Sequence, residues 1–486
     1  HNVIGIIFYY VVSKILTPTE IGIMSTLNFV HATFVVLAPL GLQFAAVKYV
    51  AEHLAQGENE KASAVARTMI KLVLAASIGF LILFVAFAVS FVQKWVEMDK
   101  VETLYVVISV AATFGALRNA YLALLQGLQL FDKYAVANLA SMGLSKLLGI
   151  VFVLLGHRLL GVVTGTLLGE IGGLSLTFFY YRGNLPPTRE GVKQRPLLNF
   201  SLPIFGMMLL ATFQDWSDRM LFLIVSRDLD ALGLFELVIR ASASLGIIGA
   251  IVDVIMFPTF SDAFAKGGKR NIGSMMGVAL RYLGFMYFPA AVGMATISKT
   301  AMTILYQART AEAGYLPLTI ISIFTIFGTF ATILNSGLKA IGKTSAFIRI
   351  SLLALAVDGA IVYFLPPLIG LYGAVVARCA SFFVTFTYTF LLFRRECELR
   401  IDYEGLLKGI IASISIVPPV ALLDKYVHFT NIFFSLGAEI TVAVFTYLLA
   451  LLLIRALNEH DFNILKQIIP VRLHTILNIL ERVYLR

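Results

Sequence analysis

Long apolar runs, separated by short breaks rich in charge, glycine or proline, follow one another along almost the whole chain. A run of about 20 residues spans the hydrocarbon core of a bilayer as a helix. Fourteen runs reach or approach this length, at approximately 2–16, 22–47, 69–93, 103–127, 134–156, 159–181, 197–225, 231–260, 277–298, 313–338, 344–365, 369–393, 404–423 and 432–454. The first run is short for a span, so we expect it to belong to a helix that begins earlier. Prolines inside the runs predict bent helices at Pro39, Pro203, Pro258 and Pro289.

The composition agrees with a membrane protein built from helices alone. Hydrophobic residues make up 59% of the 486 residues, charged residues only 14%, and the mean hydropathy is +0.88. A soluble domain carries about 25% charged residues. The sequence therefore predicts an all-α, polytopic membrane protein with about 14 transmembrane helices.

Basic residues indicate the orientation. With the amino terminus in the cytoplasm, about 25 of the 38 lysines and arginines fall in inner loops and the tail, and about 8 fall outside. We therefore predict a multi-pass protein of the cell (cytoplasmic) membrane with both termini in the cytoplasm. Because this asymmetry accounts for much of the net charge of +10, the charge is no sign of nucleic-acid binding.

A weak internal repeat divides the runs into two sets of six. Gly22 and Gly233 lie 211 residues apart in similar surroundings, and Gly127 with Gly337 and Gly161 with Gly373 have nearly the same spacing. An even number of spans makes the two copies parallel. We therefore predict two parallel six-helix bundles joined by a linker, then a C-terminal two-helix hairpin and an amphipathic cytoplasmic tail. The first repeat covers residues 1–182, the linker 183–195, the second repeat 196–395, the hairpin 396–455 and the tail 456–486. The linker lies in the polar stretch RGNLPPTREGVKQR at 182–195, whose prolines and charges break a helix. The tail is equally compatible with a loosely held terminus.

No catalytic or metal-binding motif is evident. Cys379 and Cys397 form no disulfide or metal framework, and neither a Walker loop nor an HExxH or GxSxG motif is present. The Asp228 and Asp230 pair lies in a tight outer turn, where solvation of a helix end is the simpler explanation. We expect no enzyme, no metal and no cofactor.

Ionisable residues inside the runs are the main candidate site. They are costly at that depth unless they are paired or face water, so they predict the lining of an interior. The stretch Asn199–Arg240 is the most charged, and Asp215 with Arg219 and Glu236 with Arg240 can pair within one helix. The candidate cations for a substrate are Arg118, Lys146, Arg219, Arg240 and Arg378, and the candidate groups for ion or proton coupling are Glu170, Asp215, Asp218, Glu236, Asp253 and Asp358.

The charges do not follow the repeat. Subtraction of the repeat spacing puts Glu236 opposite Ser25 and Arg240 opposite Phe29. A structural network tolerates duplication with its scaffold, so the asymmetry favours a functional role and a coupling site in the acid-rich second repeat, faced by Arg118 and Lys146 across a cavity. The alternative to a functional role is that these charges form structural ion pairs that hold the helices of a bundle together.

The run that begins KILTPTEIGIMSTLNFV at Lys14, with its Glu20-Ile21-Gly22 turn, resembles the opening of the polysaccharide-transporter (Wzx-type) flippases of the MOP exporter superfamily. The resemblance extends to Asp218-Arg219-Met220-Leu221 and Leu232-Gly233-Leu234-Phe235, and it covers residues 1–395 at pattern level. It departs from that pattern where Glu236 and Arg240 stand in place of small, hydroxylic residues.

The resemblance implies a MOP exporter-like fold. It also implies that the protein moves a polyprenyl-(pyro)phosphate-linked oligosaccharide from the inner to the outer leaflet by alternating access. Such a protein binds this lipid and membrane lipids, can act as a monomer or with glycan-assembly proteins, and can couple to Na⁺ or H⁺. Two alternatives stay open. One is a MATE-type, cation-coupled drug or metabolite exporter, and the other is a glycan-assembly scaffold or membrane-embedded glycosyltransferase.

Overall fold

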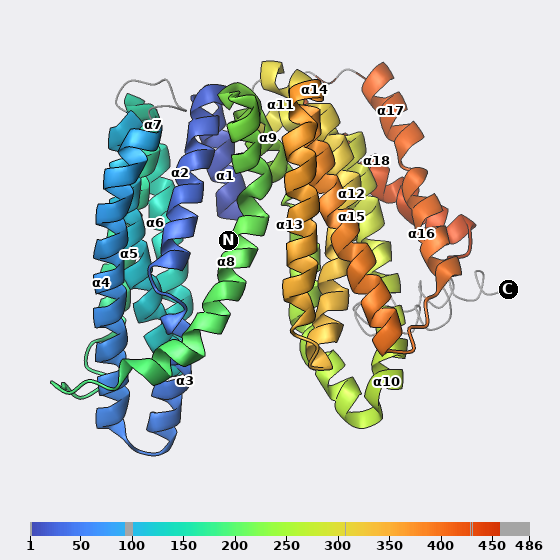
Figure 1. The fold of residues 1–486 in the computed structure, drawn as a ribbon. Coiled ribbons are helices and arrows are strands. Elements are labelled where there is room, and N and C mark those ends of the chain that lie inside the picture. The colour runs from blue at the N-terminus through green and yellow to red at the C-terminus, as the bar shows by residue number, and fades with distance from the viewer. Residues whose placement is uncertain (1, 93–100, 307, 428, 430, 457–486) are drawn as a thin grey trace, which may run out of the picture. The chain divides into compact units, whose positions relative to one another are not determined.

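The computed structural model describes residues 2–92, 101–306, 308–427, 429 and 431–456, and the regular elements within these ranges are all helical (Figure 1). They are α1 (Asn2–Ser13), α2 (Pro18–Leu37), α3 (Leu42–Ala55), α4 (Asn59–Val92), α5 (Val101–Gly127), α6 (Phe131–Phe152), η1 (Val153–His157), α7 (Arg158–Tyr181), α8 (Gln194–Ser226), α9 (Leu229–Ser242), α10 (Gly246–Thr296), α11 (Ser298–Leu305), α12 (Ala308–Ala340), α13 (Ala346–Phe364), α14 (Pro366–Ile369), α15 (Leu371–Glu396), α16 (Tyr403–Ile414), α17 (Val417–Tyr426) and α18 (Ile432–Leu453). The all-α prediction is confirmed.

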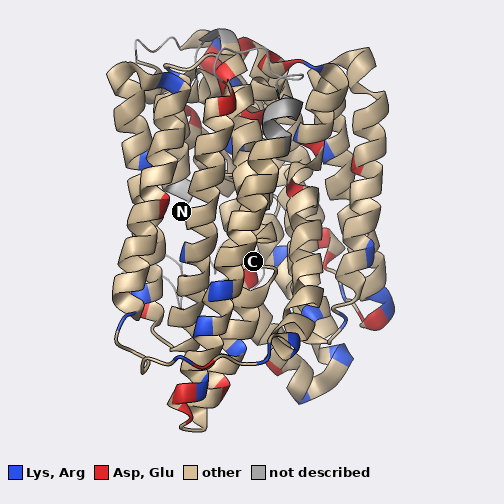
Figure 2. Ribbon diagram, turned by 60° about the vertical axis from the view of Figure 1, so that its left-hand side comes forward, with Lys and Arg blue, Asp and Glu red and all other residues tan. Residues whose placement is uncertain are grey.

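Eleven helical segments of the described part are long and apolar enough to cross a membrane. Long uncharged stretches between the charged ends are evident in Figure 2. Two of the segments, Phe131–Tyr181 and Gly246–Thr296, are 51 residues long; the first contains two of the predicted runs, and the second contains the end of the run 231–260 and most of the run 277–298. The second segment turns at Gly268, whose φ of 62° is a conformation that glycine adopts readily and other residues rarely do. The chain is thus a polytopic membrane protein, while the count of fourteen spans stays a prediction.

Several predicted runs are interrupted in the structure. The run 22–47 divides into α2 and α3 at a turn that contains Pro39, and the run 231–260 divides between α9 and α10. The run 404–423 divides into α16 and α17 just before a Pro-Pro pair. Residues 261–276, between the predicted runs 231–260 and 277–298, continue α10 on both sides of Gly268, where one glycine is enough for the turn. The predicted tail lies outside the described residues after Ala456.

The contacts divide the described chain into two compact units. Unit 1 comprises residues 1–240 and 354–377, and unit 2 comprises 241–353 and 378–486. Small side chains such as Ala46, Ala112 and Ala116 fill much of the core of α2 to α5 in unit 1, where they let helix backbones approach closely. The core of α10, α12 and α15 in unit 2 is more aromatic, with Tyr287 and Phe393 fully buried. The predicted domain bounds stay a prediction.

Within unit 1, α2 and α9 meet through three pairs of residues that we call the seam. The Thr19 hydroxyl donates to Asp230, and the Ser25 hydroxyl donates to the Glu236 carboxylate over 3.1 Å. Between these pairs Gly22 and Gly233 touch so closely that a Cβ on either would collide with the other helix's backbone.

The three pairs of the seam share one separation in sequence. The partners are 211 residues apart in every pair, which is the repeat spacing at Gly22 and Gly233. Residues that contact their own repeat counterparts lie on a pseudo-two-fold axis, as in an isologous interface. The packing of unit 1 at the seam therefore agrees with the duplication inferred from the sequence.

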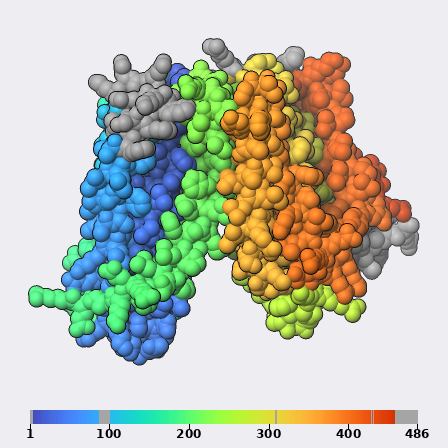
Figure 3. Space-filling view, viewed as in Figure 1, coloured from blue at the N-terminus to red at the C-terminus, as the bar shows by residue number. Residues whose placement is uncertain are grey.

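The polar segment between α7 and α8 lies along α4 at the surface of unit 1 (green, Figure 3). The Arg67 guanidinium donates to the carbonyl of Thr188 over 2.8 Å, and the amide of Val192 donates to the Thr68 hydroxyl over 3.1 Å. The predicted linker thus packs against the first repeat.

In the turn between α3 and α4, the Lys61 ammonium and then the His53 ring lower the pKa of the Glu58 carboxyl.

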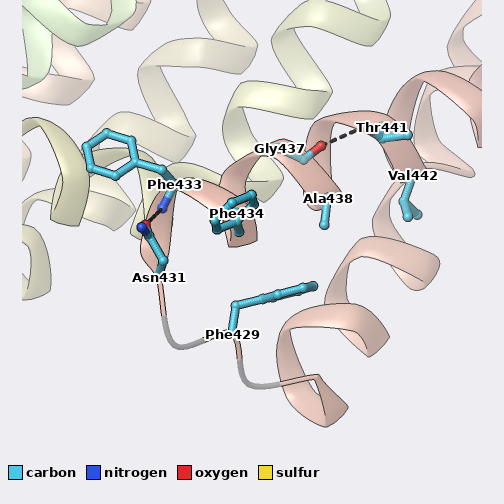
Figure 4. A pocket seen from close by; sticks show the side chains of 8 residues that line it. All are labelled: Phe429, Asn431, Phe433, Phe434, Gly437, Ala438, Thr441 and Val442. Atoms are coloured by element: carbon cyan, nitrogen blue, oxygen red, sulfur yellow. Dashed lines mark hydrogen bonds between the residues drawn. The ribbon is translucent and has the colours of Figure 1, made fainter.

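In unit 2 the hairpin of α16 to α18 is joined to α10. The buried Arg281 lies 3.1 Å from the Asp402 carboxylate and donates to the carbonyl of Ala456, while the Tyr447 hydroxyl donates to the carbonyl of Phe285 over 2.7 Å. An open groove of about 650 Å³ lies at the start of α18 (Figure 4). The described residues that line it are Phe429, Asn431, Phe433, Phe434, Gly437, Ala438, Thr441 and Val442.

The tight glycine contact of the seam predicts that Gly233→Ala destabilises the protein. The added methyl group would collide with the carbonyl of Pro18, so either the backbones separate or the helix shifts. We expect a loss of about 1–3 kcal/mol, measured by thermal unfolding in detergent. The control is Gly206→Ala in α8, where a Cβ meets nothing within 4 Å. Equal unfolding temperatures for the two variants would contradict a close contact at the seam.

Candidate functional site

A buried carboxylate, Glu236 on α9, lies at the centre of the charged cluster in unit 1. Its Oε1 accepts hydrogen bonds from the Tyr9 hydroxyl at 3.0 Å and from Arg240 Nε at 2.7 Å. Its Oε2 accepts from the Ser25 hydroxyl at 3.1 Å and from Arg219 Nη1 at 3.1 Å. Because an ionised carboxylate has about four lone-pair sites, Glu236 is fully satisfied although its side chain has no exposed surface.

Four helices bring these partners together. Tyr9 and Ser25 come from α1 and α2 of the first repeat, whereas Arg219 comes from α8 and Arg240 from α9 itself. Glu236 and Arg240 are four residues apart on one helical face, so their predicted pairing is confirmed. The pairing of Arg219 extends beyond its own helix. It lies 3.1 Å from Glu236 and 3.5 Å from Asp218, and it donates to the main-chain carbonyl of Asp215.

Aromatic rings flank each cation of the cluster. The Arg219 guanidinium lies 4.2 Å from the Trp216 ring centre, and Trp216 in turn packs on Phe29. The Arg240 guanidinium lies 5.2 Å from the Tyr9 ring, and 35% of its side chain is exposed. Arg240 is thus the cluster's arginine that is open to an incoming ligand.

Lys146 on α6 adds a third cation. Its Nζ lies 4.2 Å from the centre of the buried Phe8 ring, a favourable cation–π geometry. It interacts electrostatically with Arg240, Glu170 and Glu236, but it makes no ion pair within the described part of the chain. Lys146, Arg219 and Arg240 are the three cations around Glu236, and the Asp218 carboxylate lies 3.5 Å from Arg219. Because Lys146 makes no ion pair with a described residue and Arg240 is partly exposed, these two cations can attract an anion.

A second cluster, within the first repeat, neutralises itself. Arg118 Nε lies 2.6 Å from the Glu170 carboxylate, and its Nη1 donates to the Asn138 side chain over 3.2 Å. His31 Nε2 approaches the other oxygen of Glu170 at 3.4 Å. With its charge matched and its guanidinium occupied, Arg118 is a weaker anion ligand than Lys146 or Arg240.

The remaining predicted residues lie at three further places. Asp358 on α13 accepts a 2.5 Å hydrogen bond from the Ser217 hydroxyl of α8, next to the fully buried Asp218. Asp215 is exposed on α8. In unit 2, Asp253 accepts a hydrogen bond from Ser336, and Arg378 lies 5.8 Å from the Phe382 ring. Within the described residues, no three His, Cys, Asp or Glu side chains gather as a metal site.

The sequence did not single out every residue of the cluster. The repeat spacing indicated Ser25, because it placed this residue opposite Glu236. Nothing in the sequence indicated Tyr9, Phe8 or Trp216. Apolar runs contain many aromatic residues, and periodicity does not show which of them contacts a charged side chain. The predicted roles of the site residues, and a cavity faced by Arg118 and Lys146, stay predictions.

Comparisons with known proteins agree on one fold and one group of families. The sequence profile of the family described as "Polysaccharide biosynthesis protein" matches residues 11–313, and that of "Lipid II flippase MurJ" matches residues 241–450. A probable lipid II flippase MurJ of Rhizobium tropici is 25% identical over 158 residues, which are 31% of this chain. The matched part spans only 30% of that relative.

Solved structures extend the likeness to nearly the whole chain. A lipid II flippase MurJ in an inward closed conformation superposes with a TM-score of 0.75 at 15% identity, over 92% of this chain and 95% of that one. An inward-facing multidrug resistance MATE family transporter of the MOP superfamily superposes with a TM-score of 0.70 at 15% identity, over 81% and 94%. At this identity the likeness shows the fold, which is the MOP exporter fold expected from the sequence.

The second cluster predicts that loss of one buried partner is costly. Arg118→Met removes the guanidinium that pairs with the buried Glu170 carboxylate, so we expect a destabilisation of about 3–5 kcal/mol in thermal unfolding. The double variant Arg118→Met/Glu170→Met removes both charges and should recover most of that loss. A double variant no more stable than Arg118→Met would mean that the pair does not carry the effect.

Proposed function

The chain belongs to the polysaccharide biosynthesis protein family, and from this premise we propose that it is a flippase for a polyprenyl-(pyro)phosphate-linked oligosaccharide. In this proposal the lipid moves from the inner to the outer leaflet by alternating access. The likeness to lipid II flippases in sequence profile and fold supports the proposal. The lipid tail can stay in the bilayer while the charged and sugar-bearing head crosses a polar interior.

The two available cations beside Glu236, Lys146 and Arg240, are the observation that carries this function. Lys146 has no ion-pair partner in the described residues, and Arg240 is partly exposed. A guanidinium fork matches phosphate oxygens in geometry and charge, and an ammonium adds a compact point charge. We assign Lys146, Arg240 and Arg219 to the phosphate group of the substrate. Trp216, which is partly exposed, supplies ring surface for the first sugar.

The wider setting follows the same proposal. Both termini face the cytoplasm, by the distribution of basic residues, and the protein acts as a monomer or with glycan-assembly proteins. It transports and does not catalyse a reaction. In this orientation the amino-terminal end of α2 and the α8–α9 turn lie at the outer end of the helices, so the seam closes the outer side of unit 1.

We propose ion coupling through the carboxylates that are not part of the phosphate site. Asp358 and Ser217 offer oxygen atoms beside Asp218, and oxygen ligands suit Na⁺ or a bound proton. Glu170 is less suited, because Arg118 already balances its charge. The coupling ion is therefore expected to bind between α8 and α13.

A MATE-type exporter is the second candidate, and the superposition on a MATE transporter favours it. Its substrates are amphipathic cations, which the positive charge around Lys146 and Arg240 would repel. The two functions therefore predict substrates of opposite charge.

Neutralisation of the phosphate site should slow transport. In proteoliposomes, we expect Lys146→Gln and Arg240→Gln each to lower translocation of a fluorescent polyprenyl-pyrophosphate oligosaccharide by roughly tenfold or more, because charge-assisted hydrogen bonds to phosphate are lost. Lys61→Gln, at an exposed position near the turn between α3 and α4, is the matched control and should transport normally. Export of amphipathic cations without movement of the lipid would favour the MATE-type function.

Removal of the coupling carboxylate should uncouple transport from the ion gradient. Asp358→Asn keeps the size of the side chain and can still bond Ser217, but it carries no negative charge. We expect translocation by the native protein to accelerate with an inward Na⁺ or H⁺ gradient, and Asp358→Asn to lose at least most of that acceleration. Native transport that ignores both gradients would rule out ion coupling.

A further inference from the structure

A carboxylate of the protein already binds cations of the proposed phosphate site. Glu236 holds Arg240 Nε at 2.7 Å and Arg219 Nη1 at 3.1 Å, which are two of the three cations assigned to the substrate. Its other two hydrogen bonds come from Tyr9 and Ser25, at 3.0 and 3.1 Å. A phosphate that binds these guanidiniums has to compete with a carboxylate that is already fully satisfied.

The same carboxylate is also one half of a seam pair. Tyr9 and Ser25 belong to the first repeat, whereas both arginines belong to the second, so Glu236 joins the repeats at the same point where it neutralises the arginines. A buried carboxylate that loses its cations is strongly destabilised and has to gain water or move. Anion binding and an intact seam therefore oppose each other.

We propose that Glu236 is a built-in counter-anion that competes with the substrate phosphate for Arg219 and Arg240, so that phosphate binding releases the carboxylate and loosens its bonds across the seam. This inference rests on the proposed function, because it regulates the same phosphate site. Glu236 does not touch the substrate in this scheme and acts as a positioning residue. Lys146, which makes no ion pair with a described residue, attracts the phosphate first, and Arg240 then exchanges its partner.

Trp216 offers a reporter for this exchange. Arg219 packs on its ring at 4.2 Å, and the chain has only one other tryptophan, Trp95. In a Trp95→Phe background, fluorescence therefore reports on Trp216 alone. A change in the position of the Arg219 guanidinium alters the surroundings of this indole and hence its emission.

The experiment is a titration of the purified Trp95→Phe protein with inorganic pyrophosphate, read as Trp216 emission. We expect a saturable change, and on the order of tenfold tighter binding in Glu236→Gln, because the competing charge is gone. Glu236→Asp, measured alongside, keeps the charge but reaches the arginines less well and should bind with intermediate affinity. Translocation of the lipid substrate by Glu236→Gln should show a lower kcat with a lower KM, since binding no longer releases a carboxylate.

Ser25→Ala is the matched control. It removes one bond of Glu236 across the seam but leaves both arginines paired, so pyrophosphate affinity should stay within about twofold of the parent protein. A mere loosening of the structure would change the affinity of Ser25→Ala and Glu236→Gln alike. Affinity that rises equally in both variants would therefore overturn the proposal.

Arg240→Gln and Lys146→Gln separate this inference from the proposed function. If pyrophosphate binding is lost in these variants but does not tighten in Glu236→Gln or Glu236→Asp, the phosphate site stands and the counter-anion is refuted. If these variants bind pyrophosphate as well as the parent protein does, or the parent protein shows no saturable change, the phosphate site itself is wrong and the counter-anion fails with it.

Discussion

A carboxylate buried at membrane depth has to be surrounded by donors, and the arrangement of unit 1 around Glu236 meets this requirement. Desolvation of an ionised group is expensive unless cations and hydrogen bonds replace its water. Glu236 obtains two guanidiniums from α8 and α9 and two hydroxyl groups from α1 and α2. No single helix can supply all four at this spacing. The positions of these four helices relative to one another therefore depend on the one charge, and so does the phosphate site that we propose beside it.

The seam explains why the scaffold repeats while the charges do not. On a two-fold axis each residue faces its own counterpart, so a duplicated carboxylate at position 25 would face Glu236 at close range, with like charges buried together. The observed pair is a hydroxyl and a carboxylate, and Thr19 with Asp230 follows the same rule. Asymmetry on the axis thus has a physical reason that needs no functional role. The functional argument rests instead on Lys146, which makes no ion pair with a described residue, and on the partly exposed Arg240.

Small residues and charged residues have separate tasks in this fold. Gly22 and Gly233 let α2 and α9 approach until main-chain atoms meet, with the buried pair of Ser25 and Glu236 on one side of this contact and the exposed pair of Thr19 and Asp230 on the other. In the first repeat, Arg118, Glu170, His31 and Asn138 form a closed network with no surplus charge. A network in which every charge is paired stabilises the fold. A cluster with a cation such as Lys146, which makes no ion pair with a described residue, can instead bind an anionic ligand. The difference between the two clusters lies in pairing, and residue types alone do not reveal it.

The sequence by itself determined the helical class, the membrane setting and the approximate position of nearly every helix, because burial in lipid demands long apolar runs with internal hydrogen bonds. It also predicted the pair of Glu236 with Arg240, which is local to one helix turn. Pro39 indicated a bend where the chain turns at 38–41, but the sequence missed the break at 243–245, since hydropathy does not report where a backbone turns. Only the tertiary structure decided which charged and polar residues of different helices meet. Tyr9, Ser25, Arg219 and Glu236 are up to 227 residues apart in sequence, and their contact depends on how four helices pack.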